Sequence, residues 1–206
     1  MDNLRIIWHE LSSKYSSNTK LVESLWEEIE KSYTDKKRHY HNLAHLAYMI
    51  GKAMECKDKL ADLDTLLFSI FYHDIIYSTK RKDNEEKSAE VAQNRLTSLG
   101  VPTSKTAKCQ QQILATKHHQ DNNDSDTNYL VDFDLAILGE SLEKYHDYAK
   151  KIRKEYSMYP DFLYKKGRKK ALQHFLAMEV IFKTAEFRND YEQQARENLK
   201  IELQQL

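Results

Sequence analysis

The spacing of apolar residues constrains this chain more than any other feature of its sequence. In the stretch NTKLVESLWEEIEKSY the apolar residues recur at steps of three and four: Leu21, Val22, Leu25, Trp26, Ile29 and Tyr33. That spacing places them on one face of an α-helix. The same spacing recurs over residues 63–71 and 172–181, and no segment alternates with the period of two that is typical of a half-buried strand.

Glycine and proline, the residues that most often mark turns, are scarce. The chain has 4 Gly and 2 Pro among 206 residues, which is few for a protein rich in β-turns. Its length suits one domain with a buried core. We therefore predict a single all-α domain over residues 1–206, a helical bundle of roughly eight to ten helices.

Local signals indicate where several helices begin and end. The expected helices include residues 3–15, 18–33, 42–59, 61–77 and 104–119. Asn42 is a suitable N-cap for the third of these. The acidic stretch NEEKSAE should begin a further helix, because carboxylates favour the positive N-terminal end of a helix. Long charged helices should follow the stretch DFDLAILG, with the apolar face at residues 172–181 on one of them.

Charge and hydropathy exclude several classes of protein. The 32 Lys and Arg residues balance 32 Asp and Glu residues, so we expect neither a nucleic-acid nor a membrane partner. A mean hydropathy of -0.78 and the lack of a long apolar run exclude a transmembrane helix. The first residues lack the pattern of a signal peptide, and Cys56 and Cys109 form no CxxC pair. We therefore expect a cytoplasmic protein.

Three histidines lie within seven residues in the stretch RHYHNLAHL: His39, His41 and His45. Histidine is the commonest metal ligand, and its ordinary pKa lies near neutral pH. His41 and His45 are four residues apart, so they share a face if both are helical. The glutamate of the zinc-protease motif H-E-x-x-H is missing. Taken alone, the pair is better explained as solvated or as capping the core.

The adjacent pair His73-Asp74 is more informative, because it continues the apolar face of its predicted helix. His73 lies three residues after Ile70, and Asp74 lies four residues after it. Burying a carboxylate beside an imidazole costs several kcal/mol unless a metal ion or a salt bridge compensates. Asp132 and Asp134 lie among apolar residues in the same way, and we expect one of the two to point inward.

Short motifs follow one another in order along nearly the whole chain. They are YHNLxH, HDIIY, DNEExSA, LATxxH, DFDLAILG, IRxEY, GR and AREN, here at residues 40–45, 73–77, 83–89, 114–119, 132–139, 152–156, 167–168 and 195–198. This ordered set resembles the HD-domain superfamily of metal-dependent phosphohydrolases, and in particular a bacterial subgroup of predicted HD phosphohydrolases. The resemblance implies a helical fold of the phosphodiesterase-like type and a hydrolase activity.

The resemblance also implies a metal site formed by His45, His73, Asp74 and Asp134. Asp134 matches the last ligand of the family better than Asp132 does, because of the residues that follow it. Two imidazoles and two carboxylates suit a divalent ion such as Mn²⁺, Fe²⁺, Mg²⁺ or Ni²⁺. Such an ion can polarise a phosphoryl oxygen, so we expect one as the cofactor.

Further residues are candidates for the same pocket. A second metal ion, as in binuclear relatives, would draw on His119, His118 and Glu86, with His119 ahead of His118. A basic helix end explains the two histidines without metal, and a helix start explains Glu86. The candidates for binding a substrate phosphate are Arg38, Lys117, Arg153 and Arg168. The basic run at residues 165–170 could attract nucleic acid, but a charged helical surface is the simpler interpretation.

The run Tyr40-His41-Asn42 followed by His45 also resembles a motif of the cyclic-nucleotide phosphodiesterases. In that motif the second histidine binds metal and the first protonates the departing oxygen. The resemblance thus implies that His41 acts as a general acid and, with Asp74, belongs to the catalytic machinery, while His39 lies on the surface. General acid catalysis contributes roughly 10²–10⁴-fold. The alternative is that His41 only forms hydrogen bonds at the start of the helix.

These observations predict an enzyme that hydrolyses a phosphomonoester or phosphodiester of a small, nucleotide-like molecule. One alternative is a non-catalytic HD module that binds metal and nucleotide as a sensor. Another is an oxygenase with a di-iron HD site, which would need extra ligands from His118, His119 and Glu86.

Overall fold

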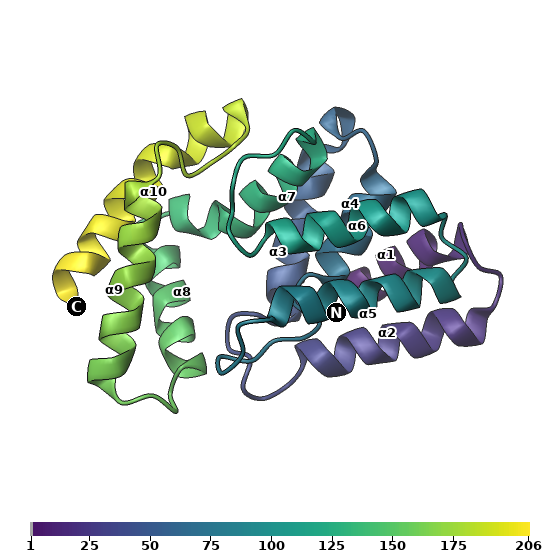
Figure 1. Ribbon diagram of the computed structural model, residues 1–206, viewed down its shortest axis with the longest axis horizontal. Helices are drawn as coiled ribbons and strands as arrows, with labels where there is room; N and C mark the ends of the chain where they lie inside the picture. The colour runs from purple at the N-terminus through teal and green to yellow at the C-terminus, as the bar shows by residue number, and fades with distance from the viewer. Residues whose placement is uncertain (1) are drawn as a thin grey trace. The chain divides into compact units, whose positions relative to one another are not determined.

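The computed structural model describes residues 2–206, and every regular element in this part of the chain is a helix (Figure 1). The α-helices are α1 (Asp2–Ser13), α2 (Thr19–Tyr33), α3 (Leu43–Glu55), α4 (Leu63–Tyr72), α5 (Asn84–Ser98), α6 (Thr103–Ala115), α7 (Ser125–Leu135), α8 (Leu142–Glu155), α9 (Asp161–Ala177) and α10 (Ala185–Gln205). Two 3₁₀ helices, η1 (Lys57–Lys59) and η2 (Ala136–Gly139), complete the set. The prediction of an all-α fold is confirmed. No helix within residues 2–206 is both long enough and apolar enough to cross a bilayer.

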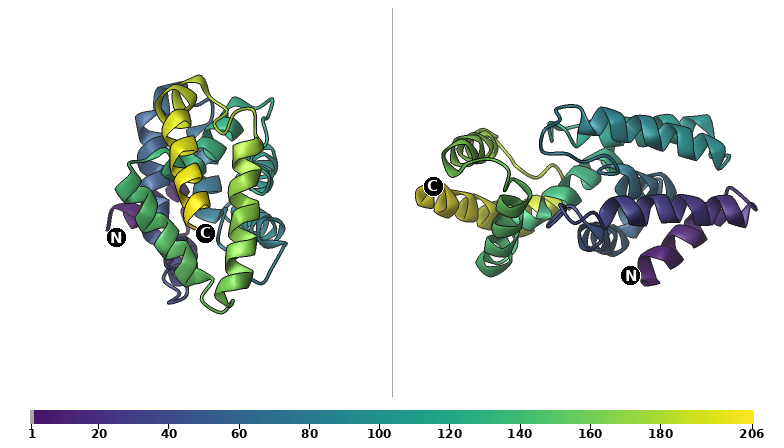
Figure 2. Two further views of the ribbon diagram at one scale, coloured as in Figure 1. Left: turned by 90° about the vertical axis from the view of Figure 1, so that its left-hand side faces the viewer. Right: turned by 90° about the horizontal axis from the view of Figure 1, so that it is seen from below.

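The helices group into two compact units, which we call unit 1 and unit 2. Unit 1 extends to Leu130 and contains α1–α6 and most of α7, and unit 2 is Val131–Leu206. Within unit 1, α5 and α6 lie side by side (Figures 1 and 2). Within unit 2, α10 packs against η2 and α9. That the chain acts as a single functional domain stays a prediction.

The core of unit 1 is built around α4. Every residue of this helix from Thr65 to Tyr72 is buried, and α3, α5 and α6 all contact it. A helix that is apolar on all sides belongs in a protein interior. The ring of Trp8 on α1 packs edge-on against Phe71 of α4 at a centroid distance of 5.3 Å. The fold therefore places His73, the C-cap of α4, at the end of its most buried helix.

α3 begins where its sequence predicts. The side-chain oxygen of Asn42 accepts a hydrogen bond from the backbone amide of Ala44 at 2.9 Å, so the predicted N-cap is confirmed. Its buried face carries His45 together with Leu46 and Met49. The helix ends at Glu55 rather than near residue 59, and η1 follows it.

α4 ends five residues earlier than predicted. The helix expected over residues 61–77 stops at Tyr72 because the next carbonyl groups bind elsewhere. Arg38 donates hydrogen bonds to the carbonyl oxygens of Asp74 at 2.6 Å and Ile75 at 3.0 Å. In a continuing helix those oxygens would accept from amides four residues later. The amide of Ile76 instead donates to the Ser88 hydroxyl at 3.1 Å.

α6 and α9 also end before their predicted limits. α6 stops at Ala115, and His119 then adopts a left-handed backbone conformation with φ of 52°, which a continuing α-helix does not allow. α9 stops at Ala177, so residues 178–181 do not extend its apolar face as predicted. Side chains of α10 hold this segment: Arg196 donates to the carbonyl of Met178 at 2.8 Å, and Glu192 accepts from the amide of Ile181 at 2.9 Å.

Unit 2 depends on a close approach between η2 and α10. A Cβ atom added to Gly139 of η2 would lie 2.6 Å from the Cβ and the carbonyl oxygen of Tyr191 on α10. Only glycine allows two backbones to come this close. The side-chain amide of Asn198 on α10 donates to the carbonyls of Leu138 and Glu140, each at 2.8 Å. These contacts satisfy the carbonyl groups at the end of η2.

Candidate metal centre

Three of the four predicted metal ligands meet in the interior of unit 1. His45 comes from the first turn of α3, and His73 and Asp74 come from the turn that ends α4. His45 and His73 are 3% and 2% exposed, and the side chain of Asp74 is 16% exposed. The sequence prediction that these three residues come together agrees with the structure.

The spacing of the donor atoms suits one metal ion. Nε2 of His73 lies 3.2 Å from Nε2 of His45 and 3.2 Å from Oδ2 of Asp74. One ligand atom from each of the three residues lies within 4.8 Å of the other two. Ligands held about 2.1 Å from one ion lie roughly 3.0 Å apart in adjacent octahedral positions and roughly 3.4 Å apart in tetrahedral ones. The group could therefore hold a divalent ion.

The hydrogen bond on the other side of the His73 ring fixes which nitrogen is available. Nδ1 of His73 lies 2.8 Å from the carbonyl oxygen of Ile70, which can only accept, so Nδ1 carries the proton. Nε2 of His73 then faces the Asp74 carboxylate at 3.2 Å. In a neutral ring this nitrogen is a lone-pair atom that a metal ion could bind, and in a doubly protonated ring it donates a salt bridge to the carboxylate. Orientation of a ligand histidine by a backbone carbonyl is common in metal sites.

Arg38 holds the Asp74 turn in place from the protein side. Besides its bonds to the carbonyls of Asp74 and Ile75, its guanidinium group lies over the rings of Tyr33 and Tyr77, at 4.8 Å and 5.5 Å from their centroids. The Tyr33 hydroxyl also accepts from the Asp74 amide at 3.2 Å. Sequence reasoning missed this role, because it gave Arg38 only as a phosphate-binding candidate.

His41 lies next to the metal group but outside α3. It precedes the N-cap and is not helical, so the condition under which His41 and His45 would share a helical face is not met. Its ring stacks on Tyr77 at a centroid distance of 4.2 Å and lies 5.8 Å from the ring of His45. His39 is exposed, as expected. The position of His41 is compatible with either of the roles that the sequence left open.

The two aspartates of DFDLAILG belong to unit 2 and differ in their surroundings. Asp132 is fully buried, and its carboxylate accepts hydrogen bonds from the amides of Lys183 and Thr184 and from the Thr184 hydroxyl, each at 2.7 Å. Burial raises the pKa of Asp132 to about 6, although the hydrogen bonds act in the opposite direction. Asp132 is thus the inward-pointing aspartate and holds the start of α10. Asp134 is half-buried, and its role as a ligand stays a prediction.

The candidates for a second ion do not join this group. Within residues 2–206, His45, His73 and Asp74 are the only set of three or more potential ligands with suitable spacing. Glu86 instead forms an ion pair with Lys117, which also donates to the carbonyl of Lys82 at 2.8 Å. His118 is exposed and His119 is half-buried. A second ion at these residues stays a prediction.

The basic residues chosen as phosphate binders all contact protein groups. Arg38 and Lys117 bind as described above. In unit 2, Arg153 pairs with Asp161 at 2.6 Å, and Arg168 forms two hydrogen bonds with Glu202, each at 2.8 Å. Phosphate binding by any of the four stays a prediction, and it would require the side chain to leave or share these contacts.

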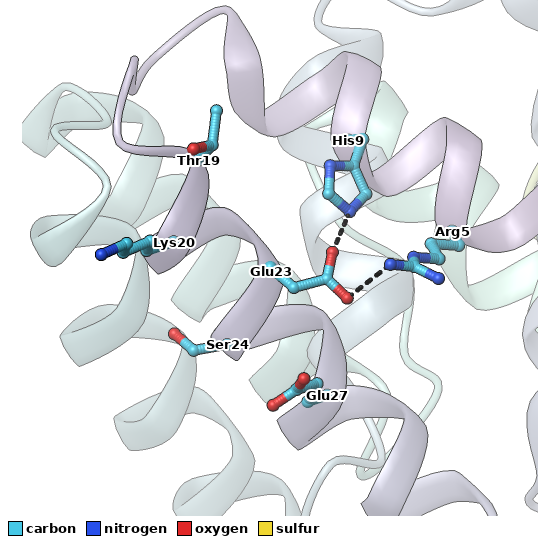
Figure 3. Close-up of a pocket in the computed structure, with 7 residues that line it drawn as sticks. All are labelled: Arg5, His9, Thr19, Lys20, Glu23, Ser24 and Glu27. Atoms are coloured by element: carbon cyan, nitrogen blue, oxygen red, sulfur yellow. Dashed lines mark hydrogen bonds and ion pairs between the residues drawn. The ribbon is translucent and has the colours of Figure 1, made fainter.

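Two of the surface hollows formed by the described residues lie in unit 1. Figure 3 shows the larger one, about 530 Å³, between α1 and α2, where Glu23 receives contacts from His9 at 2.9 Å and Arg5 at 2.7 Å. Its ionic groups therefore bind one another. The smaller, about 310 Å³, lies at the start of α3 and is lined by Lys36, Arg38 and their neighbours. Arg38 lines this hollow and also binds the carbonyl of Asp74, so it links the hollow to the turn that carries the metal group.

Comparison of the chain with protein-family models, with curated proteins and with solved structures gives no match. Membership of the HD-domain superfamily therefore stays a prediction from the motifs.

Proposed function

We propose that this protein is a metal-dependent phosphohydrolase that uses His45, His73 and Asp74 to bind a divalent ion. The observation that carries the proposal is the contact between Nε2 of His73 and the Asp74 carboxylate. With Nδ1 donating to the Ile70 carbonyl, Nε2 of a neutral His73 presents a lone pair toward the Asp74 carboxylate 3.2 Å away and toward Nε2 of His45. A divalent cation satisfies these atoms and His45 at once.

The donor set and the neighbouring groups support hydrolysis of a phosphate ester. When bound, the ion supplies Lewis acidity toward a phosphoryl group. As attack by water on phosphorus breaks the ester bond, the His41 ring, 5.8 Å from that of His45, would donate a proton to the departing oxygen, and stacking on Tyr77 fixes its orientation. Lys36 and Arg38 outnumber Asp35 among the charged residues that line the hollow at the start of α3, and this excess of positive charge suits a small anionic substrate of the nucleotide kind.

The metal is tested first, by elemental analysis of the purified protein and by titration with Mn²⁺ after treatment with a chelator. We expect about one ion per chain, and Asp74→Ala should abolish its retention. Asp132→Asn is the matched control, because its carboxylate binds the start of α10, and this variant should keep the metal. Loss of metal from the control and retention by Asp74→Ala would show that the assignment is reversed.

Turnover is tested with a panel of phosphomonoesters and phosphodiesters in the presence of Mn²⁺. His41→Ala should keep the metal and lose about 10²–10⁴-fold in rate on substrates with poor leaving groups. The loss should be much smaller on a nitrophenyl ester, whose leaving group needs no proton. Equal losses on both substrates would exclude His41 as the acid. Binding of metal and nucleotide without turnover would favour the sensor function instead.

A further inference from the structure

Unit 2 exposes a group of large apolar side chains at one end of the hairpin formed by α8 and α9. Met158, Phe162 and Leu163 are 50%, 71% and 46% exposed and lie within six consecutive residues. They occupy the short connection between the helices and the first turn of α9 (Figure 1). We call residues 156–163 the hairpin tip. Clustered exposed apolar side chains mark interaction surfaces.

The two helices that flank the hairpin tip are strongly basic. Together α8 and α9 contain ten Lys and Arg residues against four Asp and Glu residues, in a chain whose charges balance at 32 of each. We expected no membrane partner from that overall balance, which hides this local excess of positive charge. Clustered basic residues attract anionic surfaces.

The exposed lysines of α9 lie on the same side of the helix as Phe162. Lys165, Lys166 and Lys169 follow Phe162 at steps of three, four and seven residues, which return to one face at about 3.6 residues per turn. All three lysines are exposed, whereas Leu172 on another face is buried. One face of α9 therefore combines an exposed aromatic ring with positive charges.

The carboxylate at the hairpin tip does not oppose this charge. Asp161 forms an ion pair with Arg153 of α8 at 2.6 Å. Its negative charge is thus balanced by an arginine of the same hairpin, and the lysines of α9 determine the sign of the surface.

We propose that the hairpin tip docks on the surface of a membrane that contains anionic lipids. The three apolar side chains enter the boundary between headgroups and acyl chains, and the lysines of α9 contact the charged headgroups. Exposed aliphatic side chains favour a lipid surface over nucleic acid, because bases stack on aromatic rings and gain little from methionine or leucine. The docking is peripheral and does not depend on the proposed phosphohydrolase activity.

The test is sedimentation of the full chain with vesicles of phosphatidylcholine alone or of phosphatidylcholine with phosphatidylserine. We expect binding only when phosphatidylserine is present, and weaker binding as the salt concentration rises. Phe162→Ser combined with Leu163→Ser should weaken binding by about tenfold or more. Lys166→Glu combined with Lys169→Glu should weaken it by about fivefold or more for each lysine.

Two control variants match these changes away from the hairpin. Ile6→Ser removes an apolar side chain of α1 that is 53% exposed, and Lys31→Glu reverses an exposed charge on α2. Both should bind vesicles as the unmodified chain does, and circular dichroism checks that each variant is folded.

Four results would overturn the proposal. The first is binding to neither kind of vesicle, and the second is equal binding to both. The third is undiminished binding by the Phe162→Ser, Leu163→Ser variant. The fourth is a different partner at the hairpin tip. RNA binding that is lost only in the Lys166→Glu, Lys169→Glu variant would indicate nucleic acid, and a dimer that is lost in the Phe162→Ser, Leu163→Ser variant would indicate a second copy of the chain.

Discussion

Two polar clusters, one in each unit, differ in how their charges are balanced. In unit 2, Arg168 forms two hydrogen bonds with Glu202, and the Tyr145 hydroxyl donates to the same carboxylate. In unit 1, His45, His73 and Asp74 bring three potential metal ligands within 4.8 Å of one another. Burial is therefore not by itself a sign of a functional site. The distinguishing sign is a set of ligand atoms spaced so that they could share one metal ion.

The pKa of Glu202 shows how complete the balance is in unit 2. Burial alone would raise it, but the Arg168 guanidinium and the Tyr145 hydroxyl hold it below its ordinary value. The carboxylate is therefore charged at neutral pH without any ion from outside the chain. We expect this cluster to contribute to stability and the cluster of unit 1 to contribute to metal binding.

The largest effect should come from breaking the balanced cluster. Glu202→Leu leaves the charge of Arg168 buried without its partner, which should lower the free energy of unfolding by about 3–5 kcal/mol. Denaturant unfolding measures this loss. Combining Glu202→Leu with Arg168→Met should recover most of it, because an apolar pair carries no buried charge. A loss of only about 1 kcal/mol, as for an exposed ion pair, would show that Glu202 does not compensate a buried charge on Arg168.

Asp132 sharpens the comparison, because it is a fully buried carboxylate that accepts three hydrogen bonds from the protein. Its pKa in the folded protein is raised to about 6, from an ordinary value of 3.8. The folded state therefore holds the proton more tightly than the unfolded state. The stabilisation is complete below about pH 4 and is lost as the pH rises through about 6, by up to about 3 kcal/mol.

The measurement for Asp132 is the difference in unfolding free energy between the unmodified chain and Asp132→Asn, from pH 4 to pH 7. Groups that titrate equally in both proteins contribute nothing to this difference. As the pH rises, the unmodified chain should lose unfolding free energy relative to Asp132→Asn. A difference that is constant over this range would mean that the hydrogen bonds from Lys183 and Thr184 offset the effect of burial completely.

Metal addition should separate the two clusters directly. Mn²⁺ at about one hundred times its dissociation constant should stabilise the chain by about 2.7 kcal/mol. The gain should vanish with a chelator and should be absent from Asp74→Ala. The variant with Arg168→Met and Glu202→Leu should keep it. Thermal unfolding with and without Mn²⁺ gives the comparison, and a gain that survives in Asp74→Ala would place the ion elsewhere.

The smallest effect concerns the support of the metal group by Arg38. Arg38→Met removes the hydrogen bonds to the carbonyls of Asp74 and Ile75 but leaves every ligand in the chain. We expect Mn²⁺ affinity to fall by about 10–100-fold, as for other groups that orient ligands. Arg81→Met is the matched control, since Arg81 forms an exposed pair with Asp83. Unchanged affinity in Arg38→Met would mean that the turn keeps its shape without the guanidinium.

Features set by neighbouring residues in the sequence were predictable. The N-cap Asn42 and the acidic start of α5 follow from local rules, and both occur in the structure. The meeting of His45 with His73 and Asp74 followed from motif order together with the cost of burying a carboxylate.

Features set by distant residues were not predictable. The end of α4 depends on Arg38, which lies 36 residues before Asp74 in the chain. The end of α9 depends on Arg196 and Glu192 of the following helix. The apolar surroundings predicted that one of Asp132 and Asp134 points inward but did not determine which. The hydrogen bonds of Asp132 with residues 183 and 184 have no signal in the sequence.

The close approach of η2 and α10 limits the amino acids that position 139 can accept. Every amino acid except glycine brings a Cβ atom, so position 139 should accept no substitution that leaves the contact with Tyr191 in place. Gly167 in α9 has nothing within 4 Å of an added Cβ, so alanine there should be accepted and should favour the helix by about 1 kcal/mol. The glycine that ends the motif DFDLAILG thus reflects the packing of α10 rather than the chemistry of a metal site.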